Sequence, residues 1–196
     1  MRRPVNAYEQ LYRQMSFERA GLFRLVRDLV TVHCVLYPGS SVHITPSFFF
    51  SNVCYVDHAE KANRFFSDSD LVNDIINKYK EYNQDTRWRF INANFQNNLS
   101  VLEGTFDLII SLFSGRQIEY TSPYLRRGGY VLTSDEFSDH TYLMGNQHFE
   151  LQFTIQAAAG HYVVKNDDGH VRSRSSKLHG GNRYVDNGMY FIYRLK

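Results

Sequence analysis

Short apolar runs alternate with helix-like segments along most of this chain, and no other feature of the sequence constrains its fold as tightly. The run HCVLY at 33–37 is followed by Pro38 and Gly39, and VCYVD at 53–57 repeats the apolar pattern. Continuous apolar runs of this length are typical of strands buried on both faces of a parallel sheet. Similar runs predict further strands at 88–95, 106–113 and 128–135.

Helical periodicity occupies the intervals between these runs. Apolar residues recur at helical spacing over 6–30 and again over 71–82, with polar residues between them. Further helices are predicted at 58–66 and 117–125. Thr45 followed by Pro46 fits the N-cap and the first position of a short helix. This alternation predicts a three-layer α/β domain whose mostly parallel sheet has about seven strands.

The character of the sequence changes towards its end. Strand candidates at 148–156, 160–164 and 188–196 follow one another, with no clear helix between the last two. Because parallel neighbours need a long crossover, these last two are expected to form an antiparallel C-terminal strand pair at one edge of the sheet. The segment 165–188 between them is rich in turn residues and has no apolar period, which predicts a loop.

Length and charge bound the organisation of the chain and its partners. Its 196 residues suffice for one sizeable core, so we expect an α/β domain at 33–196 with an N-terminal amphipathic helix region at 1–32 packed on it. A formal charge of +2 provides no strong field for nucleic acid or anionic membranes. Neither a signal peptide nor an apolar run of roughly 20 residues is recognisable. These features predict a cytoplasmic protein that binds neither nucleic acid nor membrane.

Polar side chains gather in the loops that follow the predicted strands. In an open parallel sheet, ligands bind beyond the carboxyl ends of the strands, where the strand order reverses. Asp57 ends the second predicted strand 18 positions after Gly39, which suits a carboxylate that accepts hydrogen bonds from a ribose. Asp57 equally suits a cap for the helix predicted to begin at His58, and the two roles do not exclude each other.

The order of these elements resembles that of the class I S-adenosylmethionine-dependent methyltransferases, which have a Rossmann-like fold. In this resemblance Gly39 corresponds to the first glycine of the family's turn, Asp57 to its ribose-binding acid, and Asn94 with Phe95 to its adenine contacts. The resemblance implies S-adenosylmethionine as the cofactor. The cofactor-binding candidates are Tyr37, Gly39, Ser40, Ser41, His43, Asp57, Asn94, Phe95 and Ser111.

The turn departs from the family's pattern. Where the family has an acidic residue and then Gly-x-Gly-x-Gly, this chain has Tyr37 and then Gly39, Ser41 and His43. Each missing glycine removes a place where the backbone can approach a ligand closely. Two hypotheses therefore stand together: a methyltransferase, and a catalytically inactive protein of the same fold that serves as a binding module or partner. A third, an NAD(P)-dependent oxidoreductase, is also permitted by Asp57, although the remaining glycines of its fingerprint are absent.

Candidate catalytic bases follow the fifth predicted strand. Methyl transfer requires in-line positioning and perhaps one base for the acceptor. Asp135, Glu136 and His140 are the candidates, with Asp139 beside them, and solvated turn residues are the alternative interpretation. Their spacing matches no metal-binding pattern, so no metal site is expected. The acceptor, whether a small molecule or a protein, is not identified by the sequence.

Overall fold

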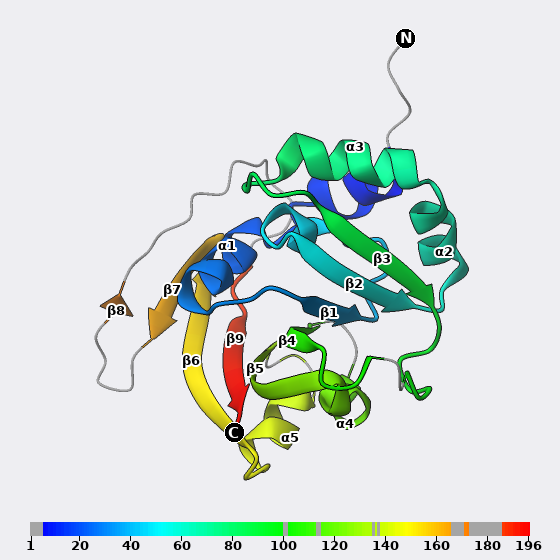
Figure 1. Cartoon of the computed structure of the whole chain (residues 1–196). Helices are drawn as coiled ribbons and strands as arrows, with labels where there is room; N and C mark the ends of the chain where they lie inside the picture. Colours follow the sequence, from blue (N-terminus) through cyan, green and yellow to red (C-terminus); the bar gives the residue numbers. More distant parts are fainter. Residues whose placement is uncertain are drawn as a thin grey trace.

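The computed structural model describes residues 6–99, 102–112, 115–134, 136, 138–165, 171–172 and 186–196. These residues form a nine-stranded sheet with helices on both faces, in the strand order β3-β2-β1-β4-β5-β9-β6-β7-β8 (Figure 1). The predicted α/β class and mostly parallel sheet are confirmed, and the sheet is wider than the seven strands expected. None of the described helices combines the length and the apolar character needed to cross a bilayer.

The first five strands are all parallel to their neighbours. They span Val35–Pro38 (β1), Asn52–Asp57 (β2), Arg87–Asn92 (β3), Phe106–Ser111 (β4) and Leu125–Ser134 (β5). The chain moves outward from β1 through β2 to β3, and then returns to place β4 on the other side of β1. The strand order therefore reverses between β1 and β4, and the carboxyl end of β1 lies at that reversal.

The other strands are antiparallel, and their arrangement corrects one detail of the prediction. They span Phe149–Ala158 (β6), His161–Lys165 (β7), Val171–Arg172 (β8) and Met189–Leu195 (β9). The expected pair of β7 and β9 does not form, because β6 lies between them and pairs with both. Ala159 and Gly160 both have positive φ, +50° and +77°, as a tight hairpin turn requires. This turn places β7 on the outer side of β6 and leaves the inner side to β9.

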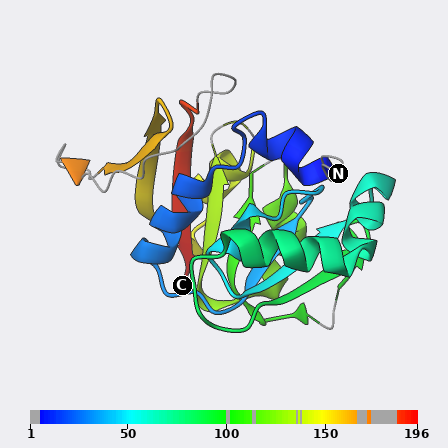
Figure 2. The ribbon, with the colours of Figure 1, turned by 90° about the horizontal axis from the view of Figure 1, so that it is seen from above.

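Different helices cover the two faces of the sheet (Figure 2). The α-helices of the described residues span Ala20–Leu29 (α1), Glu60–Ser67 (α2), Ser69–Tyr79 (α3), Gln117–Thr121 (α4) and Asp139–Met144 (α5). The helices α1, α2 and α3 share one apolar cluster with Val35 and Tyr37, whereas α4 and α5 share another with Leu36. Alternate side chains of β1 therefore enter opposite cores, as expected for a central strand.

The helix predicted over 6–30 is divided in two. A short π-helical turn, η1, spans Glu9–Arg13, and α1 begins only at Ala20. Ser16 and Arg19 lie between them with φ of +57° and +51°, and this left-handed backbone prevents one continuous helix. The short helix expected after Thr45 forms as a 3-10 helix, η2, at Thr45–Phe48.

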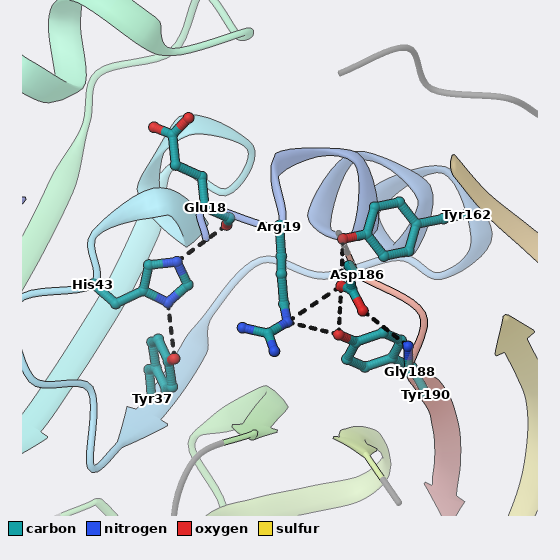
Figure 3. A network of polar contacts seen from close by, with 8 residues as sticks. All are labelled: Glu18, Arg19, Tyr37, His43, Tyr162, Asp186, Gly188 and Tyr190. Atoms are coloured by element: carbon teal, nitrogen blue, oxygen red, sulfur yellow. Dashed lines mark hydrogen bonds and ion pairs between the residues drawn. The ribbon is translucent and has the colours of Figure 1, made fainter. Parts of the chain in front are cut away.

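A buried ion pair joins the start of α1 to the chain just before β9 (Figure 3). Arg19 Nε lies 3.4 Å from Asp186 Oδ2, and the two side chains are only 2% and 5% exposed. Arg19 Nε also donates to the hydroxyl of Tyr190 at 2.6 Å. Asp186 in turn accepts the hydroxyl protons of Tyr162 at 2.7 Å and Tyr190 at 2.6 Å. The network therefore ties the N-terminal region to the antiparallel end of the sheet.

Replacing Asp186 with Asn is expected to destabilise the protein by about 3–5 kcal/mol, because the buried guanidinium of Arg19 loses its counter-charge. The double variant Arg19→Met/Asp186→Asn should recover part of this loss, since no charge then remains buried. Urea unfolding followed by circular dichroism measures the free energy of unfolding of each variant. A double variant as unstable as Asp186→Asn alone would show that the ion pair is not the cause.

Candidate functional site

The turn after β1 is held to the end of β2 by backbone and side-chain hydrogen bonds. Gly39 has φ of +62°, and its N–H donates to the carbonyl of Val56 at 2.7 Å. Ser41 also adopts a left-handed backbone, with φ of +49°, and its N–H donates to Asp57 Oδ2 at 2.8 Å. A serine takes the left-handed position that glycine would occupy without strain, and the bond to Asp57 stabilises it there.

Asp57 ends β2 and is 8% exposed. Its second oxygen, Oδ1, accepts the N–H of Ala59 at 2.7 Å, directly before α2 begins at Glu60. The side chain therefore caps the approach to α2, and it also fixes the turn after β1 through Ser41. A carboxylate offers about four lone-pair sites, so these two bonds leave room for further donors.

Tyr37 and His43 lie buried beneath the turn (Figure 3). His43 Nε2 lies 3.1 Å from the carbonyl oxygen of Glu18, which can only accept, so the ring proton is assigned to Nε2. Nδ1 is then the acceptor for the Tyr37 hydroxyl at 2.9 Å. Tyr12 stacks on the imidazole with ring centroids 4.4 Å apart. Both residues thus engage the protein itself, and burial lowers the pKa of His43 to about 3.

The loop after β3 lies beside Asp57. The N–H of Ala93 donates to the carbonyl of Asp57 at 3.1 Å, and the two strands are in parallel register up to that point. Asn94 and Phe95 follow, both half-buried. Asn94 Oδ1 accepts the N–H of Gln96 at 3.0 Å, and the ring of Phe95 lies 6.4 Å from that of Tyr120. The structure therefore brings the candidates after β2 and β3 to one edge of the sheet.

Ser111 belongs to a separate buried cluster at the ends of β4 and β5. Its hydroxyl donates to the carboxylate of Asp139, which is fully buried and also accepts the N–H groups of Gln117 at 3.1 Å and Ile118 at 3.4 Å. Burial raises the pKa of Asp139, while these hydrogen bonds oppose that rise. The carboxylate holds the first turn of α4 in place.

The side chain of Gln117 reaches across the strand-order reversal. Its Nε2 donates to the carbonyl of Pro38, the last residue of β1, at 2.9 Å, and Gln117 is fully buried. Sequence reasoning missed this residue, because 79 positions separate the two partners and no local pattern marks the contact. Asp139 and α5 were likewise unexpected as structural elements, since α5 has only six residues.

The candidate bases lie apart from the turn residues in their contacts. His140 Nδ1 lies 3.0 Å from the hydroxyl of Tyr193, and its ring stacks on Phe191 at 3.6 Å, both in β9. Glu136 is exposed, and Asp135 lies outside the described residues. Of the charged and histidine candidates in this stretch, Asp139 has its carboxylate engaged by three donors.

Comparison with solved structures places the fold in a known group. A methyltransferase from Geobacter sulfurreducens is 14% identical, with a TM-score of 0.53 over 100% of this chain and 92% of that one. A possible histamine N-methyltransferase from Thermotoga maritima, described as S-adenosylmethionine-dependent, is 13% identical, with a TM-score of 0.57 over 98% and 95%. The chain has the fold of the S-adenosylmethionine-dependent methyltransferases.

A third example is the N-methyltransferase NodS from Bradyrhizobium japonicum, 10% identical, with a TM-score of 0.54 over 92% of this chain and 96% of that one. No protein-family model matches the sequence, and no curated protein matches it either. The methyltransferase fold therefore extends over nearly the whole chain, while the sequence has diverged far from the proteins that share it.

Stability should fall with pH because of His43. Its folded-state pKa of about 3 lies below its ordinary value of 6.5, so the unfolded chain binds more protons as the pH falls through 6.5. The stability from neutral His43 is complete above that pH, and about 2 kcal/mol should be lost by about pH 5. His43→Gln retains a donor and an acceptor but does not titrate, so urea unfolding should show a smaller loss. Equal losses in the two proteins would exclude His43 as the cause.

Asp139→Ala is expected to destabilise the protein by about 2–4 kcal/mol, because two backbone N–H groups of α4 and the Ser111 hydroxyl lose their shared acceptor. Asp139→Asn keeps one acceptor oxygen and should lose less. Urea unfolding at neutral pH measures both values. The exposed Asp70→Asn in α3 serves as a control for the change in charge. A loss below about 1 kcal/mol for Asp139→Ala would contradict the proposed clamp on α4.

Proposed function

We propose that this chain binds S-adenosylmethionine or a related adenosyl compound at the carboxyl ends of β1, β2 and β3, as a methyltransferase-like protein. The carboxylate of Asp57 carries this proposal, because it ends β2 directly beside the left-handed turn at Gly39 and Ser41. This turn adjoins the strand-order reversal between β1 and β4, where ligands bind in sheets of this kind. The fold shared with S-adenosylmethionine-dependent enzymes supports the same class of ligand.

The adenosine end of such a ligand fits the residues present. Asp57 has lone pairs left after its bonds to Ser41 and Ala59, and ribose hydroxyls are donors of the right kind. Asn94 and Phe95 begin one residue after Ala93, whose N–H is bonded to the Asp57 carbonyl. A nucleobase would therefore lie against Phe95 while the ribose is held by Asp57.

The methionine end fits less well in the arrangement described. Bound S-adenosylmethionine supplies an electrophilic methyl group, and its charged amino-acid tail needs polar partners. At the end of β1, the carbonyl of Pro38 accepts from Gln117, and the N–H groups of Gly39 and Ser41 donate to Val56 and Asp57. These groups are already bonded within the protein, so no methyl-transfer step follows from this arrangement.

A second candidate function is an adenosyl-binding protein without catalysis. The contacts of the candidate bases favour it, because His140 is stacked on Phe191 and Asp139 is buried with three donors. A base for an acceptor must present a free lone pair to the acceptor proton. Binding and catalysis are separable here, since Asp57 and the loop after β3 belong to the first and these groups to the second.

Asp57→Asn should weaken the binding of adenosine about tenfold or more, because a hydrogen bond to a charged acceptor is worth roughly 1.5–3 kcal/mol. Calorimetric titration with adenosine and with S-adenosylhomocysteine measures the affinities. Asp70→Asn, an exposed change of the same charge, should leave them unaltered.

The outcomes separate cleanly. An affinity unchanged in Asp57→Asn would remove this carboxylate from the ligand site. If the unmodified chain binds neither adenosyl compound at millimolar concentration, the proposed function is wrong. Tighter binding of a nicotinamide dinucleotide in the same titration would favour an oxidoreductase instead.

A further inference from the structure

We propose that the amide of Gln117 closes the position of the ligand's amino-acid tail, so that this site prefers nucleosides that end at or shortly after the 5′ carbon. Adenosine and 5′-methylthioadenosine are ligands of this class, whereas S-adenosylmethionine and S-adenosylhomocysteine carry the full tail. The inference rests on the proposed binding of adenosyl compounds at Asp57.

The strand order fixes the direction in which a tail would run. The nucleobase position follows β3, the ribose position ends β2, and the next strand in the sheet is β1. A 5′ substituent therefore extends over the end of β1, towards the reversal between β1 and β4. The first backbone carbonyl that it meets there is that of Pro38, the last residue of β1.

This carbonyl is covered by Gln117. The amide donates to it at 2.9 Å, and the whole residue is buried, so its side chain occupies the space between the end of β1 and α4. A tail would have to displace the amide before its ammonium group could reach the same oxygen. Without that displacement, the charged ends of the tail would be buried without partners, which is strongly unfavourable.

Gln117 is firmly held. Its N–H donates to Asp139 at 3.1 Å, its carbonyl accepts from Thr121 Oγ1 at 2.8 Å, and the next N–H, of Ile118, also points to Asp139. These bonds come from α5 on one side and from within α4 on the other. Withdrawal of the side chain therefore has to occur by rotation of the side chain alone, because the backbone is fixed.

The N-terminal region closes the other side of the turn. Tyr12 forms a hydrogen bond to the side chain of Ser41, and its ring stacks on His43 at 4.4 Å. The turn at Gly39 thus lies between Tyr12 and Gln117, and both contacts are made by the chain itself. Neither contact involves the loop after β3, so the nucleoside position is unaffected by them.

Calorimetric titration of the full-length chain with adenosine, 5′-methylthioadenosine and S-adenosylhomocysteine tests the inference. We expect the two short ligands to bind at least tenfold more tightly than S-adenosylhomocysteine. In Gln117→Ala, which removes the amide, the affinity for S-adenosylhomocysteine should rise at least tenfold, while that for adenosine changes less than twofold. The exposed Gln147→Ala is the matched control and should change neither affinity.

A second variant guards against a folding defect. Gln117→Asn keeps an amide but is one methylene shorter, so it should shift the preference in the same direction, and thermal unfolding establishes that each variant is folded. If the unmodified chain binds S-adenosylhomocysteine as tightly as adenosine, the inference is wrong although the proposed function stands. The inference also fails if neither variant raises the affinity for S-adenosylhomocysteine. Absence of binding for all three ligands in every protein would refute the proposed function itself.

Discussion

The carboxylate of Asp57 is the point on which the arrangement of the candidate site depends. It bonds to Ser41 on one side and to Ala59 on the other, so it joins the turn after β1 to the approach to α2. The left-handed backbone of Ser41 costs roughly 1–2 kcal/mol relative to a relaxed conformation. A hydrogen bond to a charged acceptor contributes about 1.5–3 kcal/mol, which offsets that cost. The turn can therefore keep its shape with a serine where a glycine would be unstrained.

Much of the fold could be predicted from local pattern. Continuous apolar runs predicted the parallel strands, because a strand covered on both faces has no polar side to show. The end of β2 at Asp57 and the turn at Gly39 followed from the same pattern. The place of β7 could not be predicted, because it depends on a hairpin at Ala159 and Gly160 that lacks the Asn-Gly or Asp-Gly signal.

The site was less predictable than the fold, and for a physical reason. A polar residue in a loop after a strand can face a ligand or another part of the protein, and only the tertiary contacts decide between them. Tyr37 and His43 bond to each other beneath the turn, because the segment carrying Tyr12 and Glu18 covers them. Gln117 carries no local signal at all, since its role depends on the distant Pro38.

The contact between Gln117 and Pro38 does not by itself decide which ligands can bind. A neutral amide donor to a carbonyl contributes about 1 kcal/mol, and an ammonium donor to the same oxygen would be roughly twice as strong. A tail could therefore compete for Pro38 if the amide were free to leave. Asp139 changes this balance, because it fixes the backbone of Gln117 and limits where the displaced amide can go. The sheet thus determines where a nucleoside would lie, while a carboxylate on α5 controls what may follow its 5′ carbon.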